Sequence, residues 1–109
     1  MAAAGKAGAP MNSCIPMNHP YLDPSFLVSW SRLTPDAIKP DVTEAIARAR
    51  ANIQAICDQP LDSLTYESTF GALEKASEEL HLGWGRIMHL DSVNDEPAQR
   101  EAIGEMLPE

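Results

Sequence analysis

Glutamate and histidine at helical spacing are the side chains of this sequence best suited to chemistry. Glu78 and His81 form a Glu-x-x-His step, the spacing by which di-metal carboxylate bundles bind their ions. Such a site needs a second Glu-x-x-His step and two more inward carboxylates, and the sequence has no second step. We therefore interpret Glu78 and His81 as a solvent-facing pair.

Other catalytic and metal-binding patterns are also missing. The zinc-peptidase motif His-Glu-x-x-His is absent. His81 and His89 stand eight residues apart, so on one helix they lie two turns from each other and cannot share an ion. Cys57 lies beside Ile53 and Ile56 in an apolar pattern, which predicts a small core residue rather than a nucleophile. The sequence thus predicts no catalytic, cofactor or metal site in this chain, which should be inactive alone.

The charge and hydropathy of the chain exclude some classes of binding partner. The 109 residues carry 16 acidic and 8 basic side chains, a net charge of -8. Such a chain repels a phosphate backbone, so we expect no nucleic acid partner. No apolar run is long enough to span a membrane, and no basic amphipathic helix is present to bind a membrane surface. The N-terminus lacks a secretory signal and only two cysteines occur, Cys14 and Cys57, which favours the reducing cytoplasm.

The pattern along the chain predicts an all-α fold with an extended start. Residues 1–16 are rich in small residues and are predicted to be a disordered leader. Residues 17–40 contain four prolines among apolar side chains, which predicts an extended arm. Residues 41–109 are predicted to be the helical segment, an antiparallel hairpin followed by a third helix.

The first predicted helix begins at Asp41, which with Glu44 has the spacing of a capping box, and ends before Pro60. Its apolar face is Val42, Ile46, Ala49, Ile53 and Ile56.

The second predicted helix is capped by Thr65 or Ser63 and runs unbroken to about residue 93. Its apolar stripe is Tyr66, Phe70, Leu73, Ser77, Leu80, Trp84 and Ile87, continued by Leu90 and Val93. The acidic opposite face is predicted to face solvent. The first helix is too short to cover this stripe, which suggests a piece that packs against more protein.

The third predicted helix has Asn94 or Asp95 as its cap and Pro97 in its first turn. Its apolar side is Ile103, Met106 and Leu107, and it ends at Pro108.

An ordered set of short blocks resembles the N-terminal region of the thimet oligopeptidase and oligopeptidase A family of zinc metallopeptidases. The blocks are NHPYLD (18–23), AIKPDVTEAI (37–46), TYEST (65–69), ALEKASEEL (72–80) with WGRIMHLDSVND (84–95), and EPAQREAIGEMLP (96–108). Tyr66 and Ser68 depart from the family pattern. In that family this region is helical and belongs to the wall and roof of a deep substrate channel. The zinc ligands lie far downstream, so the resemblance implies zinc in the parent enzyme and none in this chain.

Two interpretations of function remain open. The chain is either the N-terminal segment of a zinc-dependent oligopeptidase that acts on short peptides, or a free-standing helical interaction module or homodimer. Its partner is accordingly the remainder of the peptidase, another helix, or a second copy. Candidate packing or partner contacts are Tyr66, Phe70, Trp84, His89, Leu90 and Asn94.

Two features of the second helix carry alternatives of their own. His89 is either a hydrogen-bonded packing residue or a substrate or partner contact. Gly83 and Gly85 flank Trp84, and glycine in a helix interior costs about 1 kcal/mol relative to alanine. They predict a notch that admits another helix near Trp84, with a hinge as the alternative.

Overall fold

The computed structural model describes residues 19–109, and within that range the chain is all-α with no strand. Its main helices are α2 (Pro35–Cys57), α3 (Ala72–Ala76), α4 (Glu78–Val93) and α5 (Pro97–Met106). Single turns of 3-10 helix occur at Pro20–Leu22, Trp30–Arg32 and Leu61–Ser63, and a π-helical turn at Glu67–Gly71. The predicted leader, residues 1–16, lies outside the described residues, as does Cys14.

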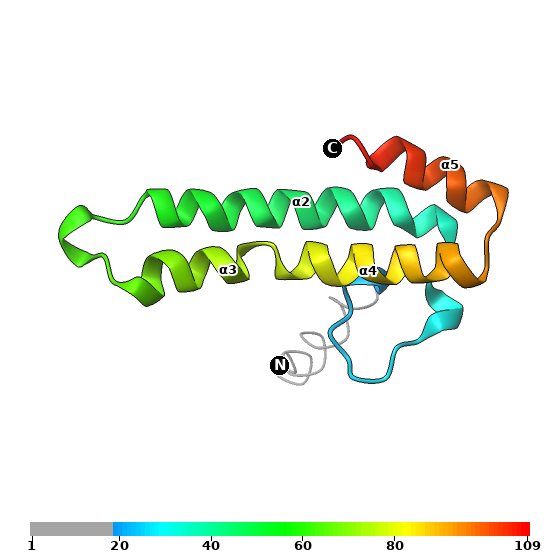
Figure 1. Cartoon of the computed structure of the whole chain (residues 1–109), viewed down its shortest axis with the longest axis horizontal. Coiled ribbons are helices and arrows are strands. Elements are labelled where there is room, and N and C mark those ends of the chain that lie inside the picture. Colours follow the sequence, from blue (N-terminus) through cyan, green and yellow to red (C-terminus); the bar gives the residue numbers. More distant parts are fainter. Residues whose placement is uncertain (1–18) are drawn as a thin grey trace, which may run out of the picture.

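The helices form a long pair with additions at one end. Figure 1 shows α2 lying along α3 and α4, with the chain direction reversed between them, and α5 folding back beside α2. Residues 19–34, which we call the strap, cross the opposite side of α4 at the same end. The core lies at this end, which we call the proximal end. Its buried apolar residues are Tyr21, Leu33, Ile38, Val42, Ile87 and Met106.

The first helix begins at Pro35, so the predicted start at Asp41 is wrong. Thr34 precedes it in extended conformation, and Pro35 occupies the first turn, where a missing N–H is tolerated. Pro40 lies inside the helix near its N-terminus, where it removes a single backbone hydrogen bond. Asp41 is no cap, because its carboxylate accepts the backbone N–H of Tyr21 at 2.8 Å.

The second predicted helix is broken, so its expected continuity from the turn to residue 93 is wrong. Thr65 does cap its start: Thr65 Oγ1 accepts the Ser68 N–H at 3.0 Å, and Ser68 Oγ accepts the Thr65 N–H at 2.9 Å. The break falls at Ser77, whose φ of -113° and ψ of 20° are not helical. It separates α3 from α4 in the middle of the apolar stripe.

The third helix follows its predicted range, but its cap differs. Glu96 is the residue before α5, and no side chain caps that end, so neither Asn94 nor Asp95 fills the predicted role. Asn94 instead closes α4, where its N–H donates to the Leu90 carbonyl at 2.7 Å.

Cys57 is exposed at the end of α2, which contradicts the prediction of a core residue. The apolar periodicity continues to the last turn of α2, but the packed core lies at the other end of the helix.

Gly83 is a notch, although it admits the strap rather than another helix. A Cβ atom at Gly83 would lie 2.9 Å from Leu22 Cδ2 and 3.6 Å from the Tyr21 carbonyl oxygen. At Gly85 a Cβ atom would meet nothing within 4 Å. The two glycines therefore differ in role although they are two residues apart.

This contrast gives a matched pair of substitutions. We expect Gly85→Ala to raise the free energy of unfolding by about 0.5–1 kcal/mol, because alanine favours the helix and meets no neighbour. We expect Gly83→Ala to gain less than Gly85→Ala, because the new Cβ atom would force the end of the Leu22 side chain to shift. Urea denaturation of both variants measures the difference. Equal gains in stability would show that the strap does not pack at Gly83.

Candidate interaction surface

The strap is anchored by two buried charged side chains, one from each long helix. Asp41 of α2 is 1% exposed and Arg86 of α4 is 8% exposed. The Asp41 carboxylate accepts the Tyr21 N–H at 2.8 Å and lies 3.0 Å from His19 Nδ1. Arg86 donates to the carbonyl oxygens of Tyr21 and Asp23 at 3.0 and 2.7 Å. Backbone donors and acceptors of a single turn are thus satisfied by opposite charges.

Neither Arg86 nor Asp41 was predicted to anchor another segment. Arg86 follows Gly85 in the predicted stripe helix, and its partners lie more than 60 residues away in the sequence. Asp41 had a local pattern that fits a helix cap equally well. No spacing rule reports such a contact between distant segments.

The far end of the helical pair, which we call the distal end, leaves large apolar side chains in solvent. The chain turns there from α2 to α3 (Figure 1). Its exposed apolar residues are Ile53, Leu61, Leu64, Tyr66, Phe70 and Leu73. Tyr66 and Phe70 contact each other with ring centroids 5.6 Å apart, yet both stay largely exposed. A concentration of this kind is typical of a surface that another protein covers.

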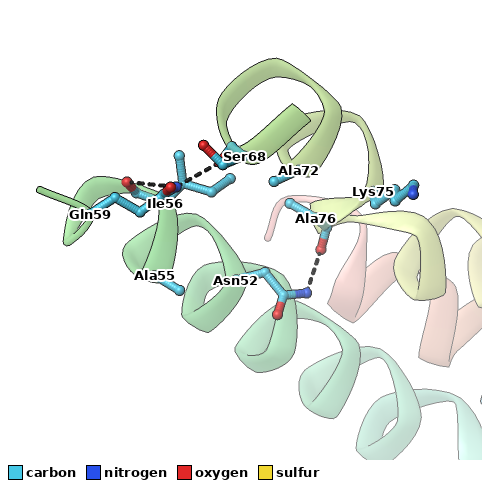
Figure 2. A pocket seen from close by; sticks show the side chains of 8 residues that line it. All are labelled: Asn52, Ala55, Ile56, Gln59, Ser68, Ala72, Lys75 and Ala76. Carbon is cyan, nitrogen blue, oxygen red and sulfur yellow. Dashed lines mark hydrogen bonds between the residues drawn. The ribbon is translucent and has the colours of Figure 1, made fainter. Parts of the chain in front are cut away.

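A groove between the two helices of the distal end explains its thin packing. The groove is open, has a volume of about 550 Å³, and separates α2 from the π-helical turn and α3 (Figure 2). Two side-chain amides bridge it: Asn52 donates to the Ala76 carbonyl at 3.0 Å, and Gln59 donates to the Ser68 carbonyl at 2.6 Å. The other lining residues are Ala55, Ile56, Ala72 and Lys75. Polar bridges over small side chains hold this end together in place of an apolar core.

The predicted contact residues divide between the two ends. Trp84 and Leu90 are half-buried against the proximal core. Asn94 is exposed at the end of α4. His89 is exposed, and its ring lies 5.3 Å from that of Trp30 in the strap.

Tyr66 and Phe70 form part of the distal surface, on the same predicted stripe as Trp84. The structure therefore does not bring the six predicted residues together in one site.

The strap also presents apolar side chains to solvent. Phe26 and Leu27 are 96% and 79% exposed, at the apex of a loop whose base is tied by the Tyr21 hydroxyl donating to the Thr34 carbonyl at 3.2 Å. Exposed apolar side chains thus occur both at the distal end and on the strap.

Fold and surface together define a helical segment with one packed end and one uncovered end. Over 92 residues, 84% of its length, the chain is 30% identical to oligopeptidase A of Haemophilus influenzae and to oligopeptidase A of Escherichia coli K12. Oligopeptidase A of Salmonella typhimurium matches at the same identity and coverage. These comparisons confirm the resemblance to the oligopeptidase A family. The chain spans 13% of the length of each of these relatives.

No family model and no solved structure matches the chain. Within residues 19–109, no group of three or more histidine, cysteine, aspartate or glutamate side chains could hold a metal ion. No helix of the described range is long and apolar enough to cross a bilayer.

Proposed function

We propose that this chain is the non-catalytic N-terminal helical segment of a cytoplasmic, zinc-dependent oligopeptidase that hydrolyses short peptides. The observation that carries the proposal is the 92-residue match to oligopeptidase A, which covers most of this chain and a small part of each relative. In this proposal the segment helps to form the wall of the substrate channel and limits substrate size. The zinc ion and its ligands belong to the remainder of the enzyme.

The uncovered distal end supports the same proposal. Phe70 is 58% exposed and Leu73 is 50% exposed. Both lie on the same apolar stripe as Ile87, which is fully buried in the proximal core. Burying apolar surface stabilises a protein by about 25 cal/mol per Å², so leaving such side chains in water forgoes stability. The remainder of the peptidase chain is the partner we propose for this surface.

A free-standing interaction module or homodimer is the second candidate, because the same uncovered surface would serve a separate partner. In that case the distal end would bind an apolar helix or a second copy of the chain. The two candidates differ in the size of the protein that contains this sequence in the cell.

An immunoblot of a lysate of the source organism separates the two candidates. The antibody is raised against residues 17–109, and a sample of it pre-absorbed with the purified chain is the control. We expect a band several times heavier than 11.9 kDa, the mass of this chain. A band at that mass would contradict the peptidase proposal and favour the module.

A further inference from the structure

The distal end has no core of its own. No side chain in residues 50–75 is buried, although this stretch includes the end of α2, the turn and most of α3. The apolar stripe of a helix is normally buried against another element. Here the two helices are joined by the Asn52 and Gln59 bridges, which leave the stripe exposed. The distal end therefore needs a third element to cover it.

A helix is the element that fits this surface. Residues 19–109 contain no strand, so a partner finds no sheet edge there to extend. Tyr66, Phe70 and Leu73 stand at steps of four and three, the spacing with which one helix packs on another. Small side chains in the groove of Figure 2 allow a second helix to approach closely. These are Ala55, Ala72 and Ala76.

The distal end is also acidic. Residues 51–76 carry four acidic side chains and one basic side chain, Lys75. The acidic residues, all exposed, are Asp58, Asp62, Glu67 and Glu74. None of the four belongs to an ion pair within residues 19–109. Their charges are therefore available to a partner.

Two of these carboxylates flank the apolar stripe. Glu67 directly follows Tyr66, and Glu74 directly follows Leu73. Each carboxylate therefore lies about 100° around the helix from its apolar neighbour. A partner helix that covers the stripe would bring one of its edges close to both carboxylates, where basic side chains are favoured and acidic ones are repelled.

We propose that the distal surface is the docking site for an amphipathic helix whose apolar stripe is flanked by lysine or arginine. Its apolar side chains cover Phe70 and Leu73, and its basic side chains pair with Glu67 and Glu74. The remainder of the peptidase supplies this helix, and that source alone rests on the proposed function. A second copy of the chain fits less well, because a symmetric pair would bring two acidic surfaces together.

Binding of synthetic helices to the 109-residue chain tests the docking site. The probe is a fluorescently labelled, alanine-based peptide of about 18 residues, with leucines at steps of three and four and lysines beside them. A companion peptide has glutamate in place of each lysine. Fluorescence anisotropy is measured at about 0.15 M salt, which screens distant exposed charges.

We expect the lysine peptide to bind at least about tenfold more tightly than the glutamate peptide. Equal binding of the two peptides, tighter binding of the glutamate peptide, or binding of neither would overturn the proposal.

Two matched pairs of variants locate the bound peptide. Phe70→Ser should weaken binding of the lysine peptide at least about tenfold, whereas Phe26→Ser, at a 96% exposed side chain of the strap, should not change it. Glu74→Gln should weaken binding about threefold, whereas Glu101→Gln, at an exposed side chain of α5, should not change it. Equal effects of the two members of either pair would overturn the assignment to the distal surface.

Light scattering on the chain alone tests the other occupant. A dimer that Phe70→Ser dissociates would assign the distal surface to a second copy and overturn the proposal. The immunoblot remains a separate test. A heavy band with binding of neither peptide would leave the proposed function standing and remove the docking site. A band at the mass of this chain with selective binding of the lysine peptide would do the reverse.

Discussion

Replacing Arg86 with methionine should lower the free energy of unfolding of the chain by about 3 kcal/mol. Methionine keeps the apolar stem of the side chain, but the carbonyl oxygens of Tyr21 and Asp23 lose a charged donor. Hydrogen bonds from charged groups contribute about 1.5–3 kcal/mol each, and a buried acceptor left without a donor is costly. Arg86 is 8% exposed, so water replaces the guanidinium poorly. Urea denaturation followed by circular dichroism measures the loss.

Arg50→Met is the matched control for this substitution. Arg50 lies exposed on α2, so removal of its charge should change the free energy of unfolding by less than about 0.5 kcal/mol. The loss of stability in Arg86→Lys should lie between the losses in Arg86→Met and Arg50→Met, because lysine keeps the charge but lacks the planar set of donors of a guanidinium group. Equal losses in Arg86→Met and Arg50→Met would show that the strap is not held by Arg86.

A loss of about 3 kcal/mol is a large part of the total folding stability of a chain of this size. Domains of about a hundred residues are stable by only about 5–15 kcal/mol, and this one has a core at one end only. The strap supplies Tyr21 and Leu33 to that core. Release of the strap therefore removes a large share of the buried apolar surface at the proximal end.

The all-α class and the ends of several helices were predictable from local signals. Pro97 starts α5 as predicted, and Thr65 caps the chain before α3. Such signals depend on residues three or four apart, which are fixed by helix geometry. The start of α2 was not predictable in the same way, because a proline generally ends a helical pattern, whereas Pro40 lies inside α2, beyond its first turn.

The break at Ser77 could not be predicted from periodicity. The apolar pattern keeps its steps of three and four across this position, so it describes one face whether or not the backbone is continuous. The same pattern places Phe70 and Trp84 on a single stripe. It cannot report that α5 and the strap cover only the proximal half, because coverage depends on segments distant in the sequence.

The anchoring of the strap was unpredictable for the same reason. Asp41 satisfied a local capping pattern, and the Tyr21 amide that it accepts is 20 residues earlier. A glycine notch also gives no sign of its occupant: Gly83 and Gly85 look alike in the sequence, and only Gly83 meets the strap. Local signals therefore predicted the elements of this segment, whereas the contacts that join them came from the fold.

Replacing Tyr21 with alanine should have a larger effect than the loss of Arg86, lowering the free energy of unfolding by about 4 kcal/mol. The side chain is fully buried in the proximal core, and truncation of a buried aromatic residue costs about 3–5 kcal/mol. Tyr21→Phe keeps the ring and removes only the hydroxyl that donates to Thr34, so it should cost about 1 kcal/mol near neutral pH. Urea denaturation at about pH 7 measures both values.

The buried hydroxyl of Tyr21 further predicts that the chain loses folding stability at alkaline pH. Burial, followed by the nearby carboxylates of Asp41, Asp36 and Glu96, raises the pKa of Tyr21 from 10.0 to about 12. The closed fold excludes the phenolate, so this contribution to stability is complete below about pH 10 and is lost as the pH rises toward 12. A shift of that size corresponds to about 3 kcal/mol.

Tyr21→Phe should lack this alkaline loss, whereas Tyr66→Phe should retain it, because Tyr66 lies on the exposed distal surface. Urea denaturation at about pH 9, 10.5 and 11.5 compares the three chains. If Tyr21→Phe loses stability as steeply as the unchanged chain, then another group causes the alkaline unfolding. The Tyr21 phenol would then be open to solvent, and the strap would not be closed over the core as the structure shows.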